Sequence, residues 1–192
     1  GKTTTLRMAL GLVTPTRGRA LIGGRLYGDL AEPRSMVGAL LEATGFHPGR
    51  SGRDHLRVLA QVAGTPKARI DEVLSLVDLG PAAETQVRTY SLGMKQRLGL
   101  AAALLGDPEV LILDEPANGL DPAGMAWLRD LLCGLASEGR TVLISSHVLS
   151  EVQQIATSVV IIQTGTLRYS GALADIPGAS LEDAFLSLTA AK

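Results

Sequence analysis

A run of aliphatic residues that ends in two carboxylates constrains this sequence more than any other feature. The unbroken apolar segment Val110–Leu113 is followed directly by Asp114 and Glu115, and a second apolar run, Thr141–Ile144, comes after a helical segment. Such runs are typical of strands buried on both faces of a parallel sheet. The order strand, helix, strand predicts right-handed crossover units in an α/β fold. The two carboxylates would then lie at the carboxyl edge of the sheet, where open sheets bind ligands.

Helix caps followed by apolar stripes predict several helices. Ser51 and Asp54 have the spacing of a capping box, and the stripe that follows them ends at Gly64. Further helices are expected to begin at Thr65-Pro66, Ser91 and Asp121-Pro122. The strand-free stretch beyond Ser51 predicts a helical subdomain of approximately residues 51–105, inserted into a single domain that covers residues 1–192. The segment Ser158–Tyr169 predicts a hairpin.

Composition excludes several functional classes. With 18 basic and 19 acidic side chains and 3% aromatic residues, the chain lacks the basic excess of a nucleic-acid-binding protein, so no nucleic-acid partner is expected. The single Cys133 excludes a disulfide framework and a cysteine-based zinc site. No apolar run approaches the ~20 residues needed to cross a bilayer, and no secretory leader is visible, so a cytosolic location is expected.

The first residues match the second half of a phosphate-binding loop. Gly1-Lys2-Thr3 fits the end of the pattern G-x-x-x-x-G-K-[ST], and Thr4 opens a segment with the character of a helix. In such a loop the lysine places its charge on the terminal phosphates, the hydroxyl of Thr3 binds Mg²⁺, and the helix N-terminus faces the anion. Alone, the pattern is short, and a chance Gly-Lys before a helix is the alternative.

The two carboxylates after the aliphatic run would supply the second half of this phosphate-binding site. At the carboxyl edge Asp114 can hold Mg²⁺ through its water shell, and Glu115 can orient or deprotonate an attacking water. The alternative, a solvated acidic turn before Pro116, accords less well with so apolar a strand. Together the two half-sites indicate an ATPase that uses ATP and Mg²⁺.

A third group of motifs identifies a family. The segment Tyr90–Arg97 resembles the signature sequence of ATP-binding-cassette (ABC) ATPases, and Asn118–Asp121 and Ser145–His147 match later motifs of that family in the right order. The resemblance covers essentially the whole chain. It implies a P-loop NTPase with a RecA-like parallel core, an inserted helical subdomain, and the first strands missing from this sequence.

The resemblance also implies roles for particular residues. Ser91 would cap its helix so that its N–H groups, together with the backbone at Gly93, face the γ-phosphate bound to a second nucleotide-binding domain. The two domains would pack head to tail around two ATP molecules. Glu115 would be the general base, His147 would contact the γ-phosphate, and Asp121 would communicate across the interface. Gly1, Lys2, Thr3 and Thr4 would bind the nucleotide.

The sequence departs from the family pattern at three positions. Leu92 and Met94 replace the usual glycine and glutamine of the signature, and Glu42 stands where the family has a glutamine. Glu42 is expected to ligate Mg²⁺ or hold water, with a solvated loop acid as the alternative. This glutamate and the closing segment Leu181–Phe185 are similar to bacitracin-, lantibiotic- and multidrug-type exporter ATPases.

The sequence begins inside the phosphate loop. The first glycine of that loop, the strand that feeds it and the aromatic residue that stacks on adenine are absent from the 192 residues. Because missing N–H donors weaken phosphate binding, we expect this chain, made as written, to bind ATP poorly and to turn over negligibly. The functional expectation concerns the intact protein.

We expect an ABC exporter subunit that hydrolyses ATP for a separate transmembrane permease and lies on the inner face of the membrane. The alternatives are a soluble, non-transport ABC ATPase and an inactive fragment. A GTPase is disfavoured because no Asn-Lys-x-Asp motif occurs. Cargo cannot be inferred from the sequence. All of this requires Lys2, Asp114 and His147 to converge around one triphosphate–metal ion pair.

Overall fold

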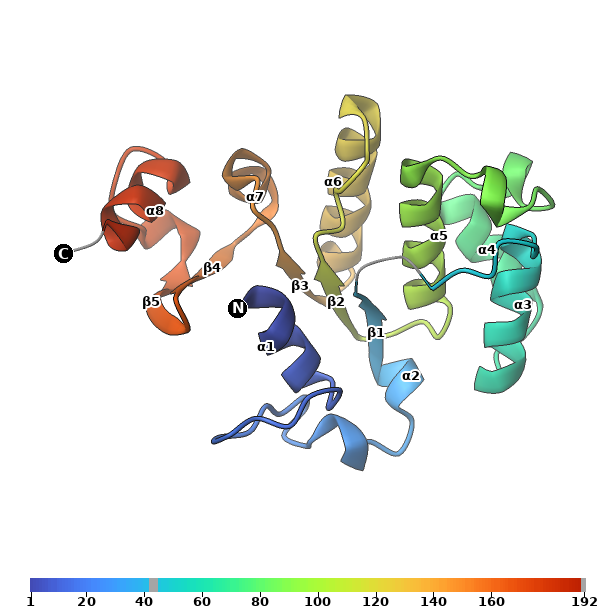
Figure 1. Cartoon of the computed structure of the whole chain (residues 1–192), viewed down its shortest axis with the longest axis horizontal. Helices are drawn as coiled ribbons and strands as arrows, with labels where there is room; N and C mark the ends of the chain where they lie inside the picture. Colours follow the sequence, from blue (N-terminus) through green and yellow to red (C-terminus); the bar gives the residue numbers. More distant parts are fainter. Residues whose placement is uncertain (42–44, 191–192) are drawn as a thin grey trace.

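A three-stranded parallel sheet forms the centre of the computed structural model, which describes residues 1–41 and 45–190 (Figure 1). Its strands are β1 (Val37–Leu40), β2 (Val110–Asp114) and β3 (Thr141–Ser145), in the order β1-β2-β3. Both pairings are parallel, which confirms the crossover topology predicted from the sequence. The register sets Asp114 opposite Ser145, so β2 and β3 end side by side.

Strand β2 is buried on both of its faces, as predicted. Leu111 and Leu113 pack in one apolar cluster with residues of helix α6 (Pro122–Ser137), whereas Ile112 packs in another with helix α1 (Lys2–Ala9). Because successive side chains of a strand point to opposite faces, the two helices cover opposite sides of the sheet.

Strand β3 contradicts the expectation of burial on both faces. From Thr141 to Ile144 its residues alternate between exposed and partly buried, Leu143 keeps 44% of its surface exposed, and only the last residue, Ser145, is buried. The reason is position: within the described residues, β3 pairs with β2 alone and forms an edge of the sheet. An apolar run indicates that a strand tends to be buried, but it does not identify the neighbours that bury it.

The predicted helix caps are present. Ser51, Ser91 and Asp121 each accept a backbone N–H bond three residues ahead, from Asp54, Met94 and Gly124. They begin α3 (Gly52–Ala63), α5 (Leu92–Leu104) and α6. The remaining described α-helices are α2 (Pro33–Met36), α4 (Ala68–Leu76), α7 (Leu149–Ile155) and α8 (Leu181–Thr189).

The start of α4 differs from the prediction. The helix begins at Ala68 rather than at Thr65-Pro66, and no side chain caps it. The N–H of Thr65 instead donates to the carbonyl of Ala60, 2.9 Å away, and so closes the end of α3 after the left-handed Gly64. Thr65, which the sequence suggests as the cap of α4, thus belongs to the motif that terminates α3.

Helices α3, α4 and α5 pack together at one end of the sheet, and α5 also lies against β1 (Figure 1). The approach to β1 is close, since a Cβ placed on Gly38 would stand 2.1 Å from the carbonyl oxygen of Ala103. Glycine at this strand position therefore lets the helix backbone reach the sheet.

The other end of the sheet carries a hairpin. Strands β4 (Ser158–Gln163) and β5 (Thr166–Ala172) are antiparallel, as predicted, although β5 runs three residues beyond Tyr169. Thr164 and Gly165 both have positive φ, which is the geometry of the commonest tight hairpin turn. Helices α7 and α8 pack together beside this hairpin. Among the described helices, none is long and apolar enough to span a membrane.

Candidate active site

Asp114 is a buried carboxylate at the carboxyl end of β2. Its side chain is 2% exposed, and its Oδ1 accepts a short hydrogen bond from the hydroxyl of Ser145 on β3. Its Oδ2 is buried without a hydrogen-bond partner. A buried carboxylate oxygen in this state is costly unless it binds a cation or an ordered water. Because hard divalent cations prefer oxygen ligands, this atom fits a Mg²⁺ site.

Glu115 follows with a left-handed backbone. Its φ of 49° is uncommon for a residue other than glycine, and strain of this kind, of order 1–3 kcal/mol, clusters at functional sites. The surrounding structure holds this conformation from two sides. The N–H of Glu115 lies 3.1 Å from the carbonyl oxygen of Ser145 and 3.2 Å from its hydroxyl, and the carbonyl of Glu115 accepts a bond from Gln96 Nε2 at 3.2 Å.

The carboxylate of Glu115 lies between two side chains from distant parts of the sequence. Lys2 Nζ is 3.5 Å from its Oε1, and His147 Nδ1 is 2.8 Å from its Oε2. The lysine and histidine side chains are 46% and 64% exposed, so both can turn toward a ligand that approaches from solvent. The structure thus brings Lys2, Asp114 and His147 to one edge of the sheet, as the sequence predicts. Their chemical roles remain predictions.

The N-terminus of α1 also borders the site, because Lys2 is its first residue. The helix begins at Lys2 after Gly1, and its first turn contains Thr3, half-buried, and Thr4, exposed. The first N–H groups of a helix lack intrahelical partners and carry partial positive charge. Together with the charge of Lys2, this end of α1 suits an anion such as a phosphate.

The remaining predicted residues form a second group. Ser91 caps α5, and the backbone at Gly93 lies so close to Gly119 that a Cβ on Gly93 would stand 3.1 Å from the Gly119 carbonyl oxygen. Leu92, 62% exposed, packs over Gly119, and Asp121 caps α6 just beyond. The start of α5 and the segment that leads into α6 therefore contact each other. Glu42 lies outside the described residues.

Sequence reasoning assigned no role to two buried polar residues that support the site. The sequence places Ser145 in a motif without a function of its own, although its parallel register with Asp114 brings it beside that carboxylate. Gln96 belongs to the signature segment, and its partner is a backbone carbonyl, for which a sequence carries no signal.

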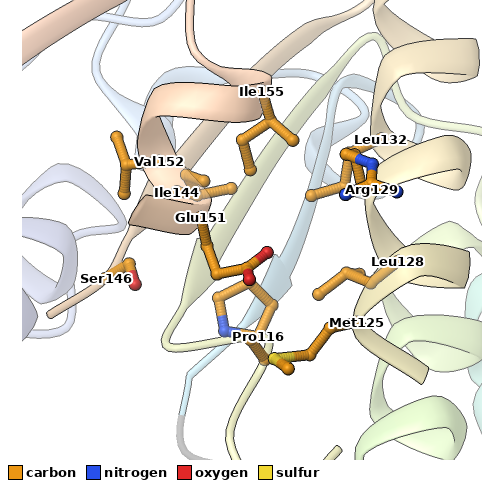
Figure 2. A pocket seen from close by; sticks show the side chains of 11 residues that line it. Pro116, Met125, Leu128, Arg129, Leu132, Ile144, Ser146, Glu151, Val152 and Ile155 are labelled. Atoms are coloured by element: carbon orange, nitrogen blue, oxygen red, sulfur yellow. The ribbon is translucent and has the colours of Figure 1, made fainter. Parts of the chain in front are cut away.

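A small hollow lies beside the loop that follows Glu115. Its walls come from α6, α7, β3 and the residues that follow Glu115. Figure 2 shows the side chains of Leu128 and Ile155 extending into it from α6 and α7, with the Glu151 carboxylate between the two helices. Leu132, Arg129 and Val152 also line it. This lining is mainly apolar and offers no cluster of donors for phosphates.

Comparison with known families agrees with this geometry. Residues 1–118 match the model of the ABC transporter family, a span that holds the phosphate-loop residues, the signature segment and the Asp114–Glu115 pair. The chain belongs to the ABC transporter family. A solved ATP-binding subunit of an ABC transporter, 29% identical, superimposes with a TM-score of 0.87 over 98% of this chain and 83% of that one. The fold is therefore that of a P-loop ATPase domain with a RecA-like core.

Curated members of the ABC family are more similar in sequence. The bacitracin transport ATP-binding protein BcrA of Bacillus licheniformis is 46% identical over 170 residues, covering 87% of this chain and 56% of its own length. The lantibiotic transport ATP-binding protein SrtF of Streptococcus pyogenes is 38% identical over 169 residues, covering 87% of this chain and 72% of its own length. The chain spans 56% of the length of the BcrA relative. A dimeric ATP-binding cassette bound to ADP and Pi shares the fold, with a TM-score of 0.80 at 21% identity.

Proposed function

We propose that the protein binds ATP and hydrolyses it to ADP and phosphate, and that this reaction powers export through a separate transmembrane permease. The observation that carries the proposal is the position of the Glu115 carboxylate between Lys2 and His147, next to the buried Asp114. A base, a phosphate-binding cation and a γ-phosphate contact are the parts that phosphoryl transfer to water requires.

In this mechanism the first turn of α1 binds the β- and γ-phosphates and Lys2 turns from Glu115 toward them. Asp114 Oδ2 and the hydroxyl of Thr3 would hold Mg²⁺, which supplies charge neutralisation to the phosphates. Glu115, released from Lys2, orients a water and accepts its proton as the water attacks the γ-phosphorus. His147, two residues beyond the end of β3, contacts the γ-phosphate. The bond to the β,γ-bridging oxygen breaks, leaving ADP and inorganic phosphate.

The second group of residues belongs to a head-to-tail dimer in this proposal. Ser91, Gly93 and Asp121 face a second nucleotide-binding domain, and the N–H groups at the start of α5 bind the γ-phosphate held there. The support is local: Ser91 caps the start of α5, and the exposed Leu92 packs against Gly119, in the segment before Asp121. Within the ATPase domain of residues 1–192, we assign the packed helices of approximately residues 51–105 to a helical subdomain that docks on the permease.

The transport role rests on the relatives. BcrA is named as a bacitracin transport ATP-binding protein and SrtF as a lantibiotic transport ATP-binding protein, which supports a transport function over a soluble, non-transport one. The protein would lie in the cytoplasm, peripheral on the inner face of the membrane through its permease. The permease would select the cargo. Bacitracin and lantibiotics, the substrates in the names of these relatives, are the first cargoes to test.

The test uses the full-length protein purified with its membrane partner in vesicles. We expect Mg²⁺-dependent release of phosphate from ATP, and faster release when the correct cargo is supplied. The soluble alternative would be favoured by two results together: a rate of phosphate release that no cargo changes, and no association of the protein with a membrane partner. No phosphate release from the intact protein would contradict the proposal.

A further inference from the structure

Gln96 is a polar residue among the buried positions of α5, which are otherwise occupied by leucine, glycine and alanine. Its side chain is 5% exposed, and the next residues that α5 buries are Leu98, Gly99 and Leu100. A buried amide is destabilising unless its donors are satisfied. The Nε2 of Gln96 donates to the backbone carbonyl of Glu115, 19 positions away in the sequence, at 3.2 Å. An apolar residue would fill this position at lower cost, so the amide needs an explanation beyond packing.

The partner of Gln96 is the strained peptide of the proposed base. Glu115 has a φ of 49°, and its N–H is held by the carbonyl and the hydroxyl of Ser145. The hydrogen bond from Gln96 holds the opposite end of the same residue, from another element. With both ends of the residue held, the backbone of Glu115 cannot relax to a right-handed conformation without breaking a bond at one end. A change of φ there would move the carboxylate away from Lys2 and His147.

We propose that Gln96 is a positioning residue that holds Glu115 in its left-handed conformation and so keeps the carboxylate of the base in place. The inference rests on the proposed ATPase function and deepens it, because it adds a residue that acts on the reaction without touching ATP. Loss of Gln96 leaves the nucleotide contacts of Lys2 and Thr3 intact. The chemical step slows, whereas ATP binding does not change.

The experiment replaces Gln96 by methionine, which keeps the length of the side chain and removes its donor. In the full-length protein we expect kcat to fall about tenfold, with the Kd for ATP, measured with a fluorescent analogue, within twofold of wild type. Leu100→Met is the matched control, because Leu100 lies on the same helix, is also buried and receives the same new side chain. It should keep kcat within twofold.

A double-mutant cycle separates positioning from general damage. Single-turnover rates are measured for Gln96→Met, Glu115→Gln and the double variant. If Gln96 acts only through the Glu115 carboxylate, the double variant is as slow as Glu115→Gln alone, within twofold. Losses that multiply, a weakened ATP affinity that accounts for the whole effect, or an equal loss in Leu100→Met would overturn the inference.

A second substitution guards against a folding defect. Gln96→Glu keeps the shape of the side chain but sets an oxygen against the Glu115 carbonyl, so it should reproduce the loss of kcat, and thermal melting shows whether each variant is folded. Retention of wild-type kcat by either folded variant would overturn the inference. Failure of wild-type ATPase activity would instead contradict the proposed function, and the two failures are therefore distinguishable.

Discussion

The hydroxyl of Ser145 donates to one carboxylate oxygen of Asp114 and accepts the N–H of Glu115, so a single side chain on β3 supports the last residue of β2 and the acidic residue that follows it. The other oxygen of Asp114 is left without a partner. This arrangement fixes the carboxylate by one oxygen and presents the other to a cation. The carboxyl ends of β2 and β3 are therefore joined by hydrogen bonds through the side chain of Ser145.

Removal of the Ser145 hydroxyl should weaken both the fold and the proposed metal site. In Ser145→Ala we expect a loss of about 1–3 kcal/mol in the free energy of unfolding, because a buried carboxylate oxygen and a buried N–H lose a partner. The Mg²⁺ concentration for half-maximal phosphate release should rise. Denaturant unfolding and a Mg²⁺ titration measure the two effects. Ser146→Ala is the control, since the hydroxyl of Ser146 accepts the local N–H of Val148; equal effects of the two variants would contradict the prediction.

Alanine substitutions at two glycines, Gly38 in β1 and Gly134 in α6, should change the free energy of unfolding in opposite directions. Gly38→Ala should destabilise the protein by about 1–3 kcal/mol or more, because the new methyl group would stand 2.1 Å from the carbonyl oxygen of Ala103. Gly134→Ala, on α6 with no atom within 4 Å of the new Cβ, should stabilise by about 0.5–1 kcal/mol through helix propensity. Denaturant midpoints of the two variants test this, and a shift of both in the same direction would refute it.

The stability of the protein should fall in mild acid because of His55. Burial, with a smaller contribution from the charge of Arg50, lowers the pKa of His55 below its usual 6.5. The ring also stacks edge-on against Phe46, and its Nδ1 is buried without a partner. As the pH falls below about 6.5, the unfolded chain takes up a proton that the folded chain does not, so unfolding becomes easier.

The test of His55 compares wild type with His55→Leu in denaturant between pH 7.5 and pH 5.5. The difference in unfolding free energy between the two proteins should shift in favour of the variant as the pH falls. A difference that stays constant across this range would show that His55 does not carry the effect.

The sequence predicts those features of the fold that local residues determine. Caps at Ser51, Ser91 and Asp121 each need one hydroxyl or carboxylate three residues before a donor, and all three are where the pattern placed them. The aliphatic run before Asp114 is similarly decisive, because a strand buried on both faces tolerates no polar residue. These signals suffice to bring the carboxylates to the edge of a parallel sheet.

The features that the sequence missed depend on partners distant along the chain. Leu143 is exposed because of where β3 stands in the sheet, and Thr65 closes α3 because of a bond to Ala60. The support from Gln96 ends on a backbone carbonyl, which has the same chemistry at every residue. Such relationships follow from the tertiary fold and leave no pattern in the order of residues.

The most direct test of the account is the turnover of Glu115→Gln in the full-length protein, measured as phosphate release beside ATP binding. Glu109→Gln is the matched control, because Glu109 is exposed and precedes the same strand at its opposite end. The account predicts that Glu115→Gln lowers kcat by about 10²–10⁴ while ATP still binds, and that Glu109→Gln turns over as wild type does. Normal turnover by Glu115→Gln would contradict it.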